Sequence, residues 1–447
     1  MTPTLPRFGQ SVRRLLPLAW PVFVGQLAVM ALGIVDTVMM GRISPEDLAA
    51  LSVGQAVYVT LFVGLMGVIL AVGPIAGRAF GARDLAGAGM SFVQAQWLAL
   101  MLAVPGMALM LFPEPFIWLA QLGPEVEAKV RAYLRPMALA LPPALLFVAF
   151  RGFATSVSRP KAVMLWQLAG LPLKVLLNLL FVQGLGLGLA GCAWATLGVM
   201  VVQMAGAQWL LRRDDFYRPF AIAHLWQTRP ERARIQGLLK LGVPMGAGIL
   251  VEVTGFTFMA FFIARLGATP VGGHQIAVNL VSAMFMTALG LGSAAGTLVA
   301  QHLGAREPQV ARAVGWHALG LSALVAAVLG GSVALLAQPI VGLFTNNAQV
   351  AAAALPLLVW VWFFHLGDAL QTVAAYVLRA HHVATLPMLA YVLALWGVGI
   401  GGGYWLAFAQ GQGALGFWRA STFGLVVAAA LLIALMAWVH RRDAASG

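Results

Sequence analysis

Twelve long hydrophobic segments recur along this chain of 447 residues, and they constrain its fold more than any other feature. Each segment is long enough to cross the roughly 30 Å hydrocarbon core of a bilayer as a helix. Each is also too long and too uniformly apolar for a barrel strand, in which polar and apolar residues alternate. The segments lie at about 14–40, 48–74, 91–112, 128–150, 161–182, 189–211, 237–264, 272–300, 313–337, 351–376, 385–409 and 415–440. The sequence therefore predicts an all-α polytopic membrane protein with twelve transmembrane helices.

The composition fits a chain whose main solvent is lipid. Hydrophobic residues make up 61% of it and charged residues only 9%, and the mean hydropathy is +0.90. A soluble domain carries about 25% charged residues. The first hydrophobic segment is longer than the apolar region of a cleavable signal peptide, and no small-residue cleavage site follows it. The one cysteine, Cys192, lies within a span, so an intramolecular disulfide is excluded and a packing role is expected.

The formal net charge of +13 is distributed unevenly between the two ends of the predicted helices. Most of the 27 basic residues fall in the terminal segments and the even-numbered loops, and few fall in the odd-numbered loops. By the positive-inside rule, both termini then face the cytoplasm, and the protein is a multi-pass protein of the bacterial inner membrane. The basic residues thus encode topology, and no nucleic-acid partner is expected.

The second half of the chain repeats the first at a constant spacing. Pro21 matches Pro244, and the loop 81–84 matches the loop 304–307, without a gap between the two matches. The same spacing links Leu15 to Leu238, Gly25 to Gly248, Arg42 to Arg265, Gly67 to Gly290 and Gly73 to Gly296. Six spans separate equivalent helices, so both halves run in the same direction. This is a parallel repeat, related by a pseudo-two-fold axis along the membrane normal.

The repeat divides the chain into an N-terminal six-helix lobe at 1–212, a cytoplasmic linker at 213–236 and a C-terminal six-helix lobe at 237–447. Two such bundles would enclose a cleft, and rocking one against the other would open it to each side of the membrane in turn. Prolines in or near the spans favour kinks that suit such movement, although static bundles contain kinks too. These prolines are Pro21, Pro142, Pro143, Pro172 and Pro244.

Three of the 14 acidic residues lie inside predicted spans: Asp36, Glu252 and Asp368. A carboxylate within the membrane is costly, so it normally faces the protein interior and carries ion or proton traffic. Glu252 and Asp368 fall near the middle of two C-terminal spans, where they could share a proton or coordinate a monovalent cation such as sodium. Asp36 lies in the first span, so each lobe has its own carboxylate centre. A structural salt bridge is the alternative role for these residues.

Lys174 is the lone basic residue within a span, and Asn178 follows one helical turn later on the same face. An ammonium group beside Asp36 would hold that carboxylate ionised or compete with a bound cation. We expect this pairing, and snorkelling of Lys174 to the membrane surface is the alternative.

Other polar side chains within spans could line a cleft or join helices by hydrogen bonds. The candidates for a substrate cavity are Gln26, Gln275, Asn279, His365 and Gln371. His365 lies one turn before Asp368 and belongs to the residue type that titrates near neutral pH, so it is a candidate proton partner. A packed, neutral histidine is the alternative. His381 and His382 have no partner at metal-ligand spacing, so a metal is not expected there.

Four separated motifs carry a resemblance to a known family. They are Val35-Asp36-Thr37 with Gly41-Arg42, the loop 81–84, the segment 191–196 and the segment 364–379 around Asp368. Together they resemble the multidrug and toxic compound extrusion (MATE) family over nearly the entire chain. Glu252 in combination with Asp368 is similar to its NorM-like branch.

The resemblance implies two six-helix lobes, a central cavity, and antiport of cationic or amphipathic drugs and dyes against sodium ions or protons. It also implies that Glu252 and Asp368 carry the C-lobe cation site. The N-lobe site would be formed by Asp36, Asn178 and Thr196. Lys174 departs from the family pattern, because relatives often have asparagine at that place. This departure favours proton coupling or a purely structural pair in the N-lobe. No cofactor is expected, and the protein is expected to act as a monomer.

A lipid-linked precursor flippase of the same superfamily is the nearest alternative function. Such a flippase should line its cavity with Arg and Lys, whereas Lys174 is the only basic residue deep in a span. An enzyme is not predicted, because no HExxH metal-binding motif or Ser/His dyad is recognisable. A channel stays open as a third interpretation, although it would not need two matched bundles.

Overall fold

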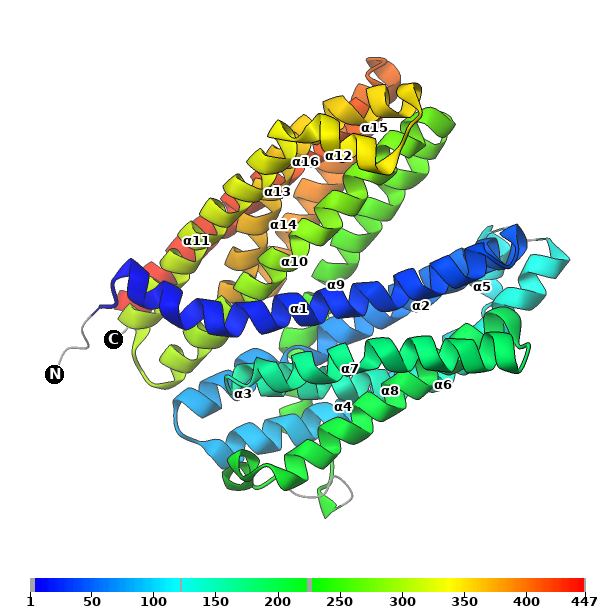
Figure 1. Ribbon diagram of the computed structural model, residues 1–447. Helices are drawn as coiled ribbons and strands as arrows, with labels where there is room; N and C mark the ends of the chain where they lie inside the picture. The colour runs from blue at the N-terminus through cyan, green and yellow to red at the C-terminus, as the bar shows by residue number, and fades with distance from the viewer. Residues whose placement is uncertain (1–4, 121–122, 223–226, 446–447) are drawn as a thin grey trace. The chain divides into compact units, whose positions relative to one another are not determined.

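The computed structural model describes residues 5–120, 123–222 and 227–445, and within these ranges it contains helices and no strand (Figure 1). Twelve helical segments of this described part are long and apolar enough to cross a membrane. They are Phe8–Gly41, Pro45–Gly81, Leu85–Leu111, Pro124–Ser156, Pro160–Gly184, Gly188–Arg213, Arg232–Ala264, Ala268–Gly304, Pro308–Leu335, Ala348–Ala380, Thr385–Ala409 and Gly413–Arg442. The predicted all-α fold with twelve transmembrane helices is confirmed.

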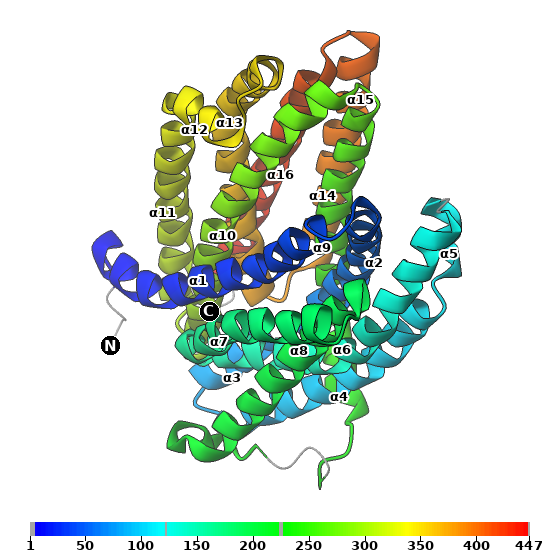
Figure 2. The same cartoon turned by 45° about the vertical axis from the view of Figure 1, so that its right-hand side comes forward.

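The N-terminal repeat contributes the first six spans. Its elements are α1 (Phe8–Gly41), α2 (Pro45–Ile69), α3 (Val72–Gly81), α4 (Leu85–Leu111), α5 (Glu114–Ala120), α6 (Pro124–Ser156), α7 (Pro160–Asn178), the π-helix η1 (Leu179–Gly184), α8 (Gly188–Arg213) and the 3-10 helix η2 (Asp215–Phe220). Within this repeat, α6 packs against α2, α4 and α8 (Figure 2). It is therefore the central helix of the group.

The C-terminal repeat follows the same order. Its elements are α9 (Arg232–Ala264), α10 (Ala268–Gly304), α11 (Pro308–Leu335), α12 (Ala337–Phe344), α13 (Ala348–Ala380), α14 (Thr385–Tyr391), the π-helix η4 (Val392–Gly401), α15 (Gly402–Tyr404), the π-helix η5 (Trp405–Ala409) and α16 (Gly413–Ala445). Here α13 is central, because it packs against α10, α11 and α16. The short helices α5 and α12 begin at Glu114 and Ala337, which are equivalent positions of the repeat.

The matched loops 81–84 and 304–307 adopt the same backbone conformation. Arg83 and Arg306 both take the left-handed region, with φ of 61° and 60°. In the first loop the Asp84 carboxylate accepts a hydrogen bond of 2.8 Å from the N–H of Gly87 and caps α4. The sequence repeat is thus also a structural repeat.

Packing divides the chain into two compact units. One unit takes the chain up to Phe23 and again from Ala247 onward, and the other spans Val24–Gly246. These units differ from the predicted lobes, 1–212 and 237–447, because the amino-terminal parts of α1 and α9 are exchanged between them. The sequence repeat marks the duplicated segments, and it does not by itself give the limits of the compact units.

Both unit boundaries fall inside a helix, at equivalent positions of the repeat. Two residues separate each boundary from a matched proline, Pro21 in α1 and Pro244 in α9. A proline inside a helix removes one backbone hydrogen bond and favours a kink. The proline therefore gives each helix a natural place at which to change its packing partners.

The segment predicted as a polar linker, 213–236, is packed at both ends. Helix η2 buries the aromatic rings of Tyr217 and Phe220 against α6. Farther along, Gln94 of α4 donates to the carbonyl oxygen of Arg229 at 3.0 Å and accepts from the N–H of Glu231 at 2.8 Å. Residues 223–226 lie outside the described part of the chain. The described ends of the linker are thus tied to helices of the N-terminal repeat.

Gly242 allows α9 to approach α2 closely. A Cβ atom at this position would lie 2.2 Å from the carbonyl oxygen of Val68. We expect Gly242→Ala to lower the unfolding temperature in detergent, because a backbone oxygen cannot move away unless the two helices separate, and overpacking of this kind costs about 1–3 kcal/mol. Gly237→Ala in the same helix is the matched control, since nothing lies within 4 Å of a Cβ there. Equal melting temperatures for the two variants would contradict the close approach.

Candidate functional site

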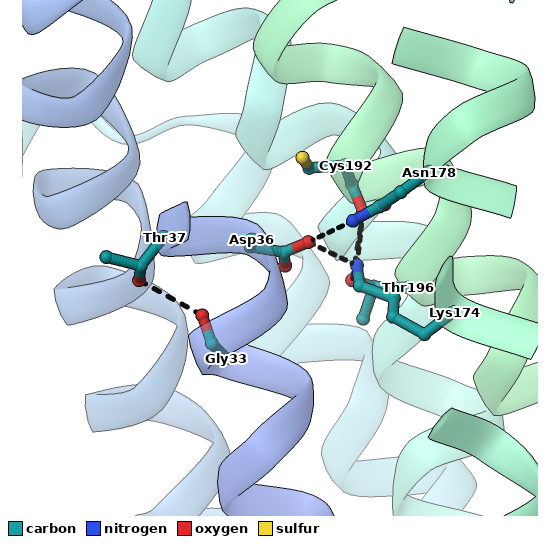
Figure 3. Close-up of polar contacts among 7 residues, drawn as sticks. All are labelled: Gly33, Asp36, Thr37, Lys174, Asn178, Cys192 and Thr196. Atoms are coloured by element: carbon teal, nitrogen blue, oxygen red, sulfur yellow. Dashed lines mark hydrogen bonds and ion pairs between the residues drawn. The ribbon is translucent and has the colours of Figure 1, made fainter. Parts of the chain in front are cut away.

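The first predicted centre lies around Asp36, within the unit Val24–Gly246 (Figure 3). Lys174 Nζ lies 2.9 Å from Asp36 Oδ1, and Asn178 Nδ2 donates to the same oxygen at 2.8 Å. All three residues are buried, at 3% exposure for Asp36, 1% for Lys174 and 0% for Asn178. The predicted pairing of Lys174 with Asp36 is confirmed, and its burial excludes snorkelling.

The ammonium group of Lys174 has all of its hydrogens directed at oxygen atoms. Besides contacting Asp36, Nζ donates to the carbonyl oxygen of Cys192 at 2.8 Å and to Thr196 Oγ1 at 2.6 Å. A lysine side chain has three donors and no acceptor, so this set satisfies it completely. Lys174 is therefore a cation built into the place where the predicted N-lobe site would hold a bound one.

Three helices supply the groups of this centre. Asp36 comes from α1, and Lys174 and Asn178 project together from α7 because they are one helical turn apart. Helix α8 contributes both the Cys192 carbonyl and the Thr196 hydroxyl, which donates to that carbonyl at 3.0 Å. The sequence spacing within α7 and within α8 thus fixes two sides of the centre, and packing against α1 adds the carboxylate.

One acceptor of this centre is left over. The Oδ1 atom of Asn178 is buried and has no hydrogen-bond partner among the described residues. Buried polar atoms of this kind are rare in folded proteins, and each calls for a water, an ion or a function. Asn178 Oδ1 is therefore a point at which this cluster can still accept a hydrogen bond.

The second predicted centre lies in the other unit and is organised by Gln371 of α13. Its Nε2 atom lies 3.0 Å from Glu252 Oε1 and 3.0 Å from Asp368 Oδ1, and 3.1 Å from Thr372 Oγ1. An amide nitrogen has two hydrogens, so it can satisfy both carboxylates but not the threonine as well. Gln371, which was predicted to line a cavity, thus bridges the two carboxylates.

Two aromatic residues of the eleventh span, neither of which was among the predicted site residues, support this bridge. The Tyr391 hydroxyl donates to Gln371 Oε1, which directs the amide nitrogen toward the acids. The indole N–H of Trp396 donates to the carbonyl oxygen of Val251 at 3.1 Å, next to Glu252. The sequence did contain a signal for both residues: each ring places a hydroxyl or indole N–H within an apolar span, and such a group needs a hydrogen-bond partner when it is buried.

A small cavity lies beside Glu252, and apart from Ser421 its other lining residues are apolar. Its volume is about 30 Å³, which is enough for a water molecule or two, since one water needs roughly 10–15 Å³ by this measure. Phe256, Met259, Phe364, Leu395, Gly399 and Leu425 are among the residues that line it. The Glu252 carboxylate therefore has space for a small polar guest within apolar surroundings.

The remaining predicted residues are distributed over both units. Gln26 accepts a hydrogen bond from Arg151 Nη1 at 3.1 Å. Gln275 donates to Asn279 at 3.2 Å on an exposed face of α10. His365 is fully buried, and neither ring nitrogen has a hydrogen-bond partner among the described residues. The structure thus does not pair His365 with Asp368, and its geometry fits the alternative of a packed histidine.

Two matched groups of six membrane-crossing helices, each with an acidic residue buried among its spans, are the arrangement of a membrane transporter with a parallel repeat. The chain belongs to the MATE family of such transporters, because the MatE family pattern matches residues 21–180 and again residues 244–405. The two matches begin at Pro21 and Pro244, the same two positions that the internal repeat pairs.

Curated relatives are similar to this chain over nearly its whole length. The probable multidrug resistance protein NorM of Aromatoleum aromaticum is 39% identical, over 96% of this chain and 94% of the relative. The multidrug resistance protein PmpM of Pseudomonas aeruginosa is 32% identical, over 99% of this chain and 95% of the relative. The predicted family and its NorM-like branch are confirmed.

The same fold is found in solved structures of low sequence identity. The MATE transporter VcmN of Vibrio cholerae, in its bent form, has a TM-score of 0.88 at 17% identity, with 98% of both chains covered. The eukaryotic MATE transporter AtDTX14 has a TM-score of 0.87 at 18% identity, again with 98% of both chains covered. At such identities the likeness shows the fold alone.

Proposed function

We propose that the protein is a cation-coupled multidrug efflux antiporter, which exports cationic or amphipathic organic compounds across the bacterial inner membrane by alternating access. The observation that carries the proposal is the presence of a buried carboxylate centre in each compact unit: Asp36 in one, Glu252 with Asp368 in the other. The multidrug resistance names of the relatives support the substrate class. Both termini face the cytoplasm, and the protein works as a monomer.

The coupling ion in this proposal is the proton. In the first centre Lys174 already supplies a positive charge to Asp36, and its three donors occupy the oxygens that a sodium ion would need. In the second centre the amide nitrogen of Gln371 occupies the point on which the carboxylate oxygens converge. A proton can add to Glu252 or Asp368 without displacing either group, whereas a sodium ion bound between these two carboxylates would displace the Gln371 amide.

The mechanism follows from the charge of the carboxylates. Protonation at Glu252 and Asp368, at Asp36, or at both centres removes negative charge from the interior of a unit and changes which conformation is more stable. The cationic substrate and the proton then favour opposite states, because each has a different affinity for the two conformations. The exit of one is thereby linked to the entry of the other. A flippase for pyrophosphate-bearing lipids is not favoured, because Lys174, the one basic residue predicted deep in a span, is already paired with Asp36.

Transport into inverted membrane vesicles tests the proposal. A fluorescent organic cation should accumulate in the vesicles when a pH gradient, acidic inside, is imposed without sodium. A sodium gradient imposed without a pH gradient should drive no accumulation. Vesicles without the protein give the background. Accumulation driven by sodium alone would show the coupling ion to be wrong, and no accumulation under either gradient would refute antiport.

A further inference from the structure

A polar cavity outside both carboxylate centres lies where α1 begins, α10 ends and α11 begins. It is lined by Pro6, Gln10, Arg13, Arg14, His302, Glu307 and Val310, all of which belong to one compact unit. Its volume is about 670 Å³, within the range of roughly 300–1,000 Å³ that is typical of small-molecule sites. The proposed transport cycle makes no use of it.

The arginines of this cavity are available to a ligand. The side chains of Arg13 and Arg14 are exposed, and neither has an ion pair or side-chain hydrogen bond with another described residue. Glu307, the acidic residue in the lining, is instead engaged by His302 Nδ1 at 2.8 Å. Each guanidinium group offers five donors in a planar fork that matches the oxygens of a phosphate. The cavity therefore has the chemistry of a phosphate site.

The beginning of α1 is held in place beside this cavity. Ser11 is fully buried, and its hydroxyl forms a hydrogen bond of 2.8 Å with His317 Nδ1 of α11. The Phe8 ring packs edge-on against the same histidine, with ring centroids 5.6 Å apart. These contacts fix the turn that carries Arg13 and Arg14, so a ligand bound there would not have to order the helix.

An apolar track continues from the arginines along α1. Leu16 and Trp20 follow Arg13 by one and two helical turns on the same face, and they are 47% and 44% exposed. The cavity itself lies at the ends of three candidate membrane spans, where headgroups meet hydrocarbon. A phosphate at the arginines would thus continue into hydrocarbon along Leu16 and Trp20. This arrangement fits a phospholipid and not a free phosphate ion.

We propose that this cavity is a binding site for an anionic phospholipid, with the headgroup phosphate held by Arg13 and Arg14 and an acyl chain along Leu16 and Trp20. Basic pockets between transmembrane helices on the cytoplasmic side are known to recognise such headgroups, and each basic residue near the surface contributes on the order of 1 kcal/mol. The site is separate from substrate export, so it does not depend on the coupling mechanism proposed above.

The test is a binding titration with the purified full-length protein in a neutral detergent. Fluorescently labelled phosphatidylglycerol is the probe, and phosphatidylcholine with the same acyl chains is the zwitterionic comparison. The wild type should bind phosphatidylglycerol more tightly than phosphatidylcholine. Arg13→Ala/Arg14→Ala should weaken phosphatidylglycerol binding by about tenfold or more and weaken phosphatidylcholine binding less, because the choline cation offsets the charge of its phosphate. Arg13→Lys/Arg14→Lys keeps the charge but loses the planar fork of donors. Its affinity for phosphatidylglycerol should lie between that of the wild type and that of the double-alanine variant.

Arg212→Ala/Arg213→Ala is the matched control, because it removes an adjacent, exposed arginine pair from the end of α8 in the other unit. It should bind phosphatidylglycerol like the wild type, and the melting temperature of each variant verifies folding. If this control lost as much affinity for phosphatidylglycerol as Arg13→Ala/Arg14→Ala, the assignment of the site would be wrong, since overall charge alone would then explain the effect. Equal affinities of the wild type for phosphatidylglycerol and phosphatidylcholine would overturn the assignment to an anionic lipid.

Discussion

Replacing Lys174 by methionine is expected to destabilise the protein by about 3–5 kcal/mol, because it leaves the Asp36 carboxylate buried without its counter-charge. The methionine side chain is similar in length, so the packing volume changes little. Unfolding in detergent by heat or denaturant measures the effect. A variant as stable as the wild type would mean that Asp36 does not depend on the ammonium group.

The double variant Asp36→Asn/Lys174→Met separates stability from transport. Replacing both charges of a buried pair by uncharged groups often changes the free energy of unfolding little. The double variant should therefore regain most of the stability that Lys174→Met loses. Its pH-driven dye accumulation should nevertheless be abolished, because the Asp36 carboxylate that would gain and lose the proton is gone. Normal transport by this variant would assign the pair a purely structural role, which is the alternative that the sequence left open.

Loss of either acid of the second centre is expected to abolish transport without loss of expression. Glu252→Gln and Asp368→Asn keep the shape of the side chain and its hydrogen bonding, but they remove the group that gains and loses a proton. Accumulation of the fluorescent cation in inverted vesicles under a pH gradient should fall to the level of vesicles without the protein.

Glu125→Gln is the control for the same chemical change. The Glu125 side chain is 74% exposed and pairs with Lys129 at 3.4 Å, and exposed pairs of this kind contribute little. This variant should transport like the wild type. If Glu252→Gln and Asp368→Asn both retained pH-driven transport, the second centre would not be the place of coupling.

Local periodicity was sufficient to predict much of this molecule. The length and apolarity of each segment predicted the spans, and the spacing of Lys174 and Asn178 placed both side chains on one face of α7. The approach of Lys174 to Asp36 was also predictable, since two opposite charges deep in one lobe have few other partners. These inferences needed only helix geometry and the cost of burying a charge.

Contacts between segments that are distant in the sequence were harder to predict. Whether Gln371 would line a cavity or bridge two acids depends on the position of Tyr391 on another helix, which no spacing along the chain reports. The exchange of packing partners within α1 and α9 was equally hidden, because hydropathy is continuous across each of these helices. His365 shows the converse error: one helical turn placed it near Asp368 in sequence, yet the two side chains do not meet through a hydrogen bond.

The exchanged segments of α1 and α9 have a consequence for the origin of the chain. Each compact unit contains a stretch that comes from the opposite half of the sequence, so neither half of the sequence contains a whole unit. An ancestor that carried a single copy of the repeat would have needed two polypeptides, each lending the beginning of its first helix to the other.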